Sequence, residues 1–143
     1  MTVIGLDDTD SRELGMCTTY VASRLAERVE AAGGVVERLL LVRLNPAVEH
    51  KTRGNAALAI HCDLDPGRAY RLADELLEMA ATDDDRTNPG AVVADCDPAA
   101  VRKKVATFAR DAVRDHHDRS AARRLREQLG YEGTTRGNGR GLV

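Results

Sequence analysis

The sequence predicts an α/β fold: an α/β sandwich with a mixed sheet, in the element order β-α-β-β-α-β, followed by two C-terminal helices. Three observations support this class. Short apolar runs alternate with segments of helical periodicity, turn and capping residues separate them, and 143 residues with 43% apolar content suffice for one core. The order matches the ferredoxin-like split unit.

A buried strand and an amphipathic helix open the chain. Val3–Leu6 is a short apolar run closed by polar residues, which is typical of a buried strand. Cys17–Ala32 is predicted to be a helix because apolar residues recur in it every four positions and two glycines follow its end. The recurring residues are Val21, Leu25 and Val29.

Two more strands and a second helix follow. Leu39–Leu44 is an apolar run that ends at Asn45–Pro46, because the residue before a proline favours extended backbone. Asn55–Cys62 is the third predicted strand. The second helix is expected to start at Pro66, where the missing N–H of the first turn costs nothing, and to run through Ala81.

The second half of the chain contains a loop, a strand and two helices. The composition of Asp83–Gly90 predicts a loop, and Ala91–Ala94 is the fourth predicted strand. Asp97–Pro98 is expected to cap a long helix that runs to about His117, and Ser120–Leu129 is expected to form a further helix. The last stretch, "GTTRGNGRGLV", contains four glycines and ends on an apolar pair, so it is expected to be interrupted rather than finished.

Charge is distributed unevenly, although the net charge is only −2. Residues 63–98 carry 3 basic and 10 acidic groups, whereas residues 99–143 carry 11 and 5. Such a basic tract meets nucleic-acid phosphates or forms a solvated helix face. The three cysteines, which lack paired spacing, predict neither a disulfide framework nor a zinc site. No apolar run reaches the ~20 residues that span a membrane, so a cytoplasmic protein is expected.

Three aspartates, Asp7, Asp8 and Asp10, follow the first strand. Carboxylates this close repel one another, so a positive group is expected to offset them. Mg²⁺ takes oxygen ligands and is usually shared between carboxylates and substrate phosphates, and ligands of open α/β sheets collect at the carboxyl ends of strands. The alternative is a capped turn in which Asp and Ser side chains satisfy backbone N–H groups. The cluster as a whole favours a metal and phosphate site.

Thr18 and the "KTRGN" segment are expected to contribute to the same site. Helical spacing puts Thr18 on the apolar face of its helix, in a first turn that also attracts anions; a hydroxyl bonded to its own helix is the alternative. Lys51 and Arg53 can grip a polyphosphate, and Gly54 lets the backbone approach closely, unless this is an ordinary surface loop. No Walker A, kinase HRD or GxGxxG motif is present, so a nucleotide site rests on this constellation.

Six short motifs lie in order along the chain: "IGLDDTDS" at 4–11, "GMCTTY" at 15–20, "RLNP" at 43–46, "KTRGNAA" at 51–57, "TNPG" at 87–90 and "RGNGRGL" at 136–142. In order and spacing they resemble the archaeal tRNA-isoleucine 2-agmatinylcytidine synthetases, the TiaS family. The motifs extend over nearly the whole chain, and their combination is specific where any single one is not.

The resemblance implies an ATP-dependent tRNA modification. Enzymes of this family activate C2 of the wobble cytidine of an isoleucine tRNA with a CAU anticodon, and agmatine then displaces the activated oxygen to give agmatidine. Their N-terminal domain is a kinase module that also phosphorylates a threonine of its own. Residues 1–130 are accordingly expected to form an ATP-dependent cytidine and threonine kinase-type domain, and residues 131–143 to begin a truncated linker or following domain. The domains that grip the tRNA would be missing.

The resemblance also implies roles for particular residues. The phosphorylated threonine corresponds to Thr18, and the DDTDS aspartates correspond to Asp7, Asp8 and Asp10. These four are the expected catalytic residues, and the three aspartates are the expected Mg²⁺ ligands. ATP is expected to contact Thr9, Ser11, Lys51, Arg53, Gly54 and Asn55. Arg12 departs from the family pattern, in which a proline often follows DDTDS, so a looser turn is expected there.

Two alternatives remain open. An apolar strand followed by Asp-x-Asp is also the entry signal of haloacid-dehalogenase-like phosphotransferases, with Asp8 as nucleophile and Asp10 as acid. The basic segment 99–143 would suit a non-catalytic RNA-binding module. The kinase hypothesis requires the acidic cluster, the lysine and arginine loop and the first turn of the first helix to converge on one nucleotide-binding cleft.

Overall fold

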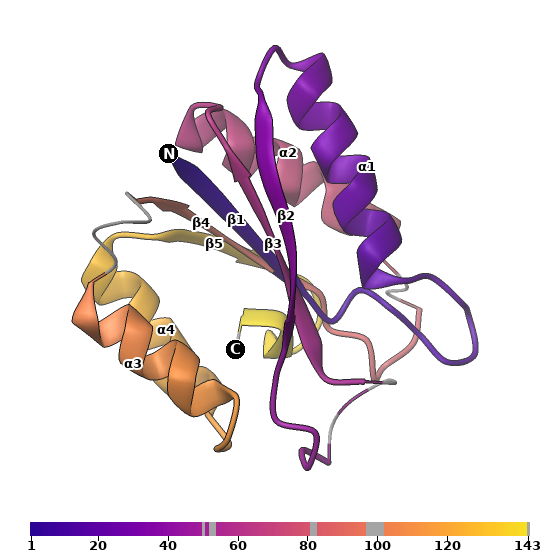
Figure 1. Cartoon of the computed structure of the whole chain (residues 1–143). Coiled ribbons are helices and arrows are strands. Elements are labelled where there is room, and N and C mark those ends of the chain that lie inside the picture. Colours follow the sequence, from indigo (N-terminus) through magenta and orange to yellow (C-terminus); the bar gives the residue numbers. More distant parts are fainter. Residues whose placement is uncertain (50, 52–53, 81–82, 97–101, 143) are drawn as a thin grey trace.

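Five strands form an antiparallel sheet in a computed structural model of the chain, in the order β2-β3-β1-β4-β5 (Figure 1). The structure describes residues 1–49, 51, 54–80, 83–96 and 102–142. The strands are β1 (Thr2–Asp7), β2 (Val36–Arg43), β3 (Ala56–Cys62), β4 (Gly90–Asp95) and β5 (Glu132–Thr135). The first four have the ferredoxin-like order, and β5 extends the sheet beyond β4.

The α/β class is confirmed, but the sheet is antiparallel instead of mixed. Every strand pair in the described residues is antiparallel. The reason lies in the two helical crossovers. The first carries the chain from β1 past β3 to β2, and the second carries it from β3 past β1 to β4, so strands that run in the same direction are never neighbours.

Helices α1 (Thr18–Ala31) and α2 (Pro66–Leu76) cover one face of the sheet and enclose the core (Figure 1). A short 3₁₀ turn, η1 (Leu77–Met79), continues α2. Alternate residues of the central strands point towards these helices, as the period of two in a strand requires. The largest fully buried apolar side chains are Ile4, Leu6, Val21, Leu25, Val29, Ile60, Leu76 and Leu77.

Helices α3 (Lys103–Ala112) and α4 (Arg119–Leu129) are the two predicted C-terminal helices. Two neighbouring residues of β5 contact different helices, and this shows on which side of the sheet α4 lies. The Thr134 hydroxyl bonds Asp74 of α2, whereas its neighbour Gly133 approaches the side chain of Arg126 of α4. Neighbouring strand residues face opposite sides, so α4 lies across the sheet from α2. Within the described residues, no helix is long and apolar enough to cross a membrane.

Several elements differ from the sequence-based expectations. Strand β2 begins at Val36 instead of Leu39, and its position at the sheet edge leaves residues 39–42, all aliphatic, 37–54% exposed. Helix α3 ends at Ala112 instead of His117, and Asp118 instead of Ser120 caps α4 by accepting a hydrogen bond from the N–H of Ala121. The expected cap at Asp97–Pro98 lies outside the described residues.

The C-terminal segment forms part of the sheet region. Beyond residue 130, where a domain boundary was expected, the described residues form β5 and a 3₁₀ turn, η3 (Arg140–Leu142), that packs on β4. In this turn the Gly141 N–H donates to the carbonyl of Asn88 over 2.9 Å. The position of the domain boundary stays a prediction, but this segment contributes to the fold described here.

Candidate functional site

A cleft of about 490 Å³ opens at the carboxyl end of β1, where the ends of several elements meet. Its wall is formed by the loop after β1, the first turn of α1, the β2–β3 connection, the α3–α4 connection and the C-terminal turn. The charged residues on the wall are Asp7, Asp8, Asp10, Lys51, Arg86, Asp115, Asp118, Arg119 and Arg140. Apolar residues line another part of it: Leu41, Leu44, Val48, Ala56, Leu58 and Ala112. A hollow with polar groups and an apolar wall is typical of a small-molecule site.

The segment at the end of β1 that carries Asp7, Asp8 and Asp10 is called the acidic loop, and all three aspartates line the cleft. Asp7 ends β1, and Asp8 turns the chain out of the sheet with a φ of 55°, a left-handed conformation that a non-glycine residue rarely adopts. The N–H of Asp8 donates to Oδ1 of Asp7 over 2.6 Å. Burial raises the pKa of Asp7 to about 7, and repulsion from Asp8 and Asp10 adds to the effect. Burial also raises the pKa of Asp8. This loop therefore holds negative charge that a cation would relieve.

Thr18 begins α1 and lies on the cleft wall beside Cys17 and Thr19. The loop before it ends with two residues of positive φ, Gly15 and Met16, which bring the helix start back towards the end of β1. The residue is only 9% exposed, and it is the first turn of α1 that carries it to the cleft. The helical phase predicted from the sequence thus puts this hydroxyl beside the acidic loop.

The β2–β3 connection supplies a third side of the cleft through Lys51, Gly54 and Asn55. The Lys51 ammonium group donates to the Pro46 carbonyl, and the Asn55 carboxamide donates to the Asn45 carbonyl over 2.9 Å. These contacts fold the connection onto the end of β2. The arginine of the motif, Arg53, lies outside the described residues. The described parts of the acidic cluster, the lysine loop and the first turn of α1 converge on one cleft, as the kinase hypothesis requires.

Thr9 and Ser11 were expected to contact ATP, but the structure places both beneath the surface. Each is fully buried, and neither belongs to the cleft wall. The Ser11 hydroxyl donates to Asp84 over 2.6 Å and accepts the N–H of Leu14 over 3.1 Å. The Thr9 hydroxyl has no hydrogen-bond partner among the described residues. These side chains support the acidic loop from inside.

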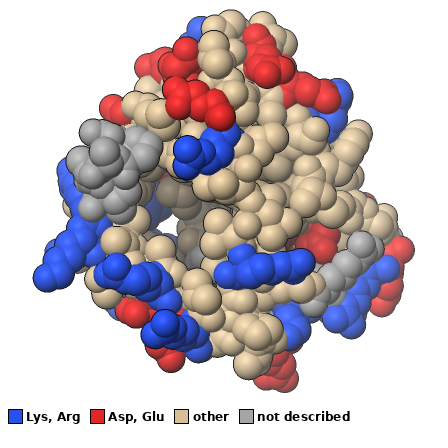
Figure 2. Space-filling view, in the orientation of Figure 1, with Lys and Arg blue, Asp and Glu red and all other residues tan. Residues whose placement is uncertain are grey.

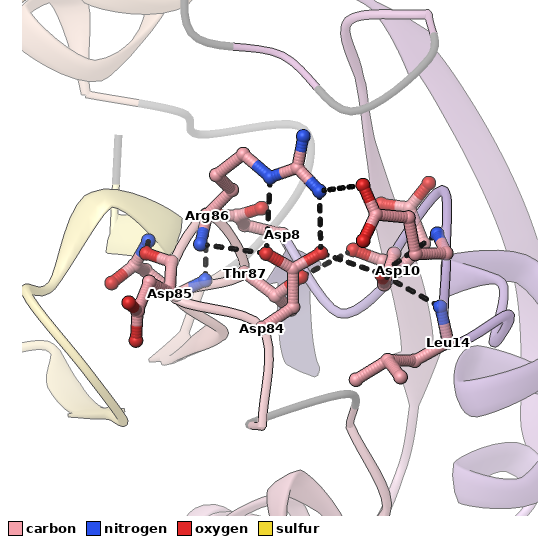
Figure 3. Close-up of polar contacts among 10 residues, drawn as sticks. Asp8, Asp10, Leu14, Asp84, Asp85, Arg86 and Thr87 are labelled. Carbon is pink, nitrogen blue, oxygen red and sulfur yellow. Dashed lines mark hydrogen bonds and ion pairs between the residues drawn. The ribbon is translucent and has the colours of Figure 1, made fainter.

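A segment that the sequence analysis treated as a loop, residues 84–88, braces the acidic loop from the other side. Figure 3 shows Asp84 between Arg86 and the loop that carries Asp10. The Thr87 hydroxyl donates to the Asp10 carbonyl over 2.7 Å, and the N–H of Asn88 donates to Oδ2 of Asp8 over 2.9 Å. Bonds from Ser11 and Arg86 lower the pKa of Asp84 to about 2. This segment fixes the loop's conformation through contacts that no local sequence pattern revealed.

Three arginines on the cleft wall were also absent from the predicted site. They are Arg86, Arg119 and Arg140. The charge of Arg140 favours the ionised form of Asp8 and so opposes the rise in its pKa. The excess of basic residues after position 99 could have identified Arg119, and the "RGNGRGL" motif could have identified Arg140, but neither signal includes Arg86. Figure 2 shows basic side chains gathered towards the part of the surface where α3 and α4 lie, with acidic ones mostly at the opposite end.

The acidic loop fits a metal ion that a substrate helps to bind, not one held in a ready-made cage. Among the described residues, no group of three His, Cys, Asp or Glu side chains is placed to hold a metal ion. Mg²⁺ usually takes one or two carboxylates together with waters and substrate phosphates. Partly buried carboxylates that repel each other, with cationic side chains on the wall of the same cleft, suit that arrangement.

Comparison with known proteins gives one consistent result. Residues 3–72 match the model of the TiaS TCKD domain. Over the full chain, 52% of residues are identical to the tRNA-isoleucine 2-agmatinylcytidine synthetase TiaS of Haloquadratum walsbyi, and 41% over 99% of the chain to that of Methanosarcina mazei. The chain spans about a third of the length of these curated relatives, 31% and 33%.

Solved structures agree with this result. The chain is similar to the crystal structure of TiaS in complex with an isoleucine tRNA and ATP, with a TM-score of 0.88 and 39% identity over 99% of this chain and 34% of that chain. It is also similar to the crystal structure of TiaS in complex with an isoleucine tRNA, AMPCPP and agmatine, with a TM-score of 0.84 and 35% identity over 99% of this chain and 34% of that chain.

Proposed function

The chain belongs to the TiaS family, and on this premise we propose that its cleft binds ATP and transfers the γ-phosphoryl group in the synthesis of agmatidine on tRNA. The observation that carries the proposal is the convergence of three sequence motifs on one cleft. Asp7, Asp8 and Asp10 come from the first motif, Thr18 from the second and Lys51, Gly54 and Asn55 from the fourth. Phosphoryl transfer depends mainly on alignment and charge neutralisation, and the cleft offers groups suited to both.

The cationic side chains of the cleft are proposed to bind the triphosphate. Lys51, Arg86 and Arg140 come from three separate connections and line the same wall. Arginine recognises phosphate with a planar fork and lysine acts as a point charge. Arg53 is expected to assist from the "KTRGN" motif. The free N–H groups at the start of α1 add a partial positive charge at Thr18.

Asp7, Asp8 and Asp10 are proposed to hold Mg²⁺ together with phosphate oxygens. When bound, the ion would neutralise the charge that develops on the transferred group. In the absence of a cation, burial raises the pKa of Asp7 to about 7, and a bound cation would favour the ionised carboxylate and so offset the cost of burying its charge.

Two acceptors fit the proposed transfer. At Thr18, the hydroxyl oxygen bonds to the γ-phosphorus, the bond to the β–γ bridging oxygen breaks, ADP leaves, and the hydroxyl proton passes to a carboxylate of the acidic loop. On tRNA, the C2 oxygen of the wobble cytidine is the acceptor. The primary amine of agmatine then attacks C2 and phosphate leaves, so one difficult displacement becomes two easier steps.

The partners proposed for this chain are an isoleucine tRNA with a CAU anticodon, agmatine and ATP. The related complexes contain an isoleucine tRNA, ATP or AMPCPP, and agmatine. The basic C-terminal third of this chain, residues 99–143, favours contact with RNA phosphates. A haloacid-dehalogenase-like reaction through Asp8 receives no support from the family assignment.

Incubation with γ-labelled ATP and Mg²⁺, followed by mapping of the labelled residue, tests the proposal. We expect an acid-stable label on Thr18 that Thr18→Ala removes. Thr19→Ala is the matched control, because Thr19 lies next in sequence and lines the same cleft, but should leave labelling unchanged. An acid-labile label on Asp8 would support the phosphotransferase alternative, and tRNA binding without ATP binding would support the RNA-binding module.

A further inference from the structure

A buried junction lies behind Asp8, where the 84–88 segment meets the C-terminal turn, residues 136–141. Asn88 is at its centre and is only 3% exposed. Its N–H donates to Asp8 Oδ2 over 2.9 Å, while its side-chain Oδ1 accepts the N–H of Asn138 over 2.8 Å. Its carbonyl accepts the N–H of Gly141 over 2.9 Å. One buried residue thus joins an aspartate of the cleft to the end of the chain.

Glycines make this junction close enough to form. A Cβ atom on Gly137 would lie 2.4 Å from Oδ1 of Asn88, and one on Gly141 would lie 2.3 Å from the nitrogen of Gly90. Neither position has room for a side chain, and Gly137 also has a φ of +64°. On the other side of the contact, a Cβ atom on Gly90 would lie 2.3 Å from the carbonyl carbon of Gly141, so glycine is required on both sides. This close approach explains Gly90 of the "TNPG" motif and Gly137 and Gly141 of the "RGNGRGL" motif, which the proposed reaction alone does not.

Asp8 depends on a contact from outside its own loop. Its backbone has the left-handed conformation, with a φ of 55°, which is unfavourable for a non-glycine residue. The negative charges of Asp10 and Asp84 also disfavour its ionised form. Within the loop, the N–H of Asp8 donates to Oδ1 of Asp7, a bond that does not involve the Asp8 carboxylate. The N–H of Asn88 binds the carboxylate itself, and this bond opposes those effects.

We propose that Asn88 is a positioning residue that aims the Asp8 carboxylate into the cleft, and that the C-terminal turn keeps Asn88 in place to do so. The inference rests on the proposed phosphoryl transfer only for its activity measurement. Its structural part concerns the conformation of the acidic loop and can be measured without nucleotide.

The glycines of the C-terminal turn provide a matched pair of variants. Gly137 and Gly139 both have positive φ, +64° and +82°, so alanine strains the backbone at either position. Only the new Cβ at position 137 would collide with Asn88; at position 139 the nearest atom is the Thr135 hydroxyl oxygen, 3.9 Å away. Gly139→Ala thus controls for backbone strain in the same turn.

Hydrogen exchange of the nucleotide-free chain is the first readout. In Gly137→Ala we expect the Asn88 N–H and the amides of residues 8–11 to exchange about tenfold faster or more, because the bond to Asp8 opens. In Gly139→Ala these rates should stay within about twofold of the wild type. Equal acceleration in both variants, or none in Gly137→Ala, would overturn the proposal.

Thr18 phosphorylation at saturating ATP and Mg²⁺ is the second readout. Gly137→Ala and Asn88→Ala should each lower the rate about tenfold or more, because displacement of a group by 1 Å can cost about 100-fold. The dissociation constant for ATP in EDTA should stay within about twofold, since no proposed phosphate ligand is altered. A weakened ATP affinity that accounts for the whole rate loss would contradict a positioning role.

A double-mutant cycle tests whether the two residues act through one contact. If Gly137→Ala acts by displacing Asn88, adding it to Asn88→Ala should lower the rate little further, whereas Gly139→Ala should combine independently with Asn88→Ala. Multiplied losses in the Gly137→Ala and Asn88→Ala double variant would refute the coupling. If the wild type shows no labelling from ATP, the proposed function fails, and the exchange contrast between the glycine variants still decides this inference.

Discussion

The Ser11 hydroxyl and the Asp84 carboxylate, 73 positions apart in the sequence, form a 2.6 Å hydrogen bond beneath the cleft. Ser11 is fully buried, and its oxygen also accepts the N–H groups of Glu13 and Leu14. One hydroxyl thus shapes the turn after the acidic loop and ties it to the 84–88 segment.

Ser11→Ala should destabilise the fold by about 1–2 kcal/mol, because it removes a buried bond to a charged group and leaves two N–H donors without their acceptor. Urea unfolding measures the change. Ser120→Ala is the control: its hydroxyl bonds Asp118 over 2.7 Å but is exposed, so the effect should stay within about 0.5 kcal/mol. Equal losses in the free energy of unfolding for Ser11→Ala and Ser120→Ala would show that the buried bond of Ser11 stabilises the fold no more than an exposed one.

Asp7→Asn should stabilise the nucleotide-free chain, more at pH 8 than at pH 5. The folded pKa of Asp7 is raised to about 7 from an ordinary 3.8. Below the unfolded pKa the carboxyl group is protonated in both states, so its titration does not change the free energy of unfolding. As pH rises from there to 7, the unfolded chain ionises and the folded chain does not, so the free energy of unfolding falls progressively. Asparagine keeps an oxygen for the Asp8 N–H and removes the charge. Urea unfolding should show that Asp7→Asn raises the free energy of unfolding by roughly 2 kcal/mol more at pH 8 than at pH 5. An equal increase at both pH values would contradict the raised pKa of Asp7.

Asp8→Asn and Asp10→Asn should each abolish labelling of Thr18 from ATP while the fold stays intact. Both side chains line the cleft and are proposed ligands of Mg²⁺, and an amide cannot replace the lost charge. Labelling and circular dichroism are to be measured on the same samples. Normal labelling in both variants would remove the argument for a metal site.

Arg140→Met should weaken ATP binding measured in EDTA about tenfold, because a charge-assisted bond to phosphate is worth roughly 1.5–3 kcal/mol. Arg123→Met is the charge-matched control, since Arg123 is exposed on α4 and does not line the cleft. Isothermal titration of both variants gives the comparison. A similar loss in the control would mean that overall charge, and not the cleft, governs affinity.

Local signals predicted those parts of the molecule that local interactions determine. The apolar run before Asp7 and the spacing of Val21, Leu25 and Val29 predicted β1 and α1, and Thr18 lines the cleft, whereas its role there stays a prediction. The apolar run that forms β2 was identified as a strand, but its exposure at the sheet edge depends on strand order, which hydrophobicity does not encode.

Contacts between distant segments were beyond local sequence reasoning. Asp84 was assigned to a turn on composition, although it bonds Ser11 across the fold. Strand β5 has only four residues, one of them Gly133, so its pairing with β4 supplies what its own propensity lacks. Thr9 and Ser11 belong to a ligand-like motif, yet burial makes them supports of the loop.

The junction at Asn88 also bears on when the protein becomes competent during its synthesis. Asp8 is synthesised well before the residue that positions it, Asn88, which lies 80 positions later, and Asn138 of the turn that holds Asn88 lies a further 50 positions on. Domains generally fold as units, and β1 lies between β3 and β4 in the sheet, so the acidic loop gains its supporting contacts only after these later segments have been made. The acidic loop would then reach its final conformation only once the glycine-rich turn of residues 136–141 has been synthesised.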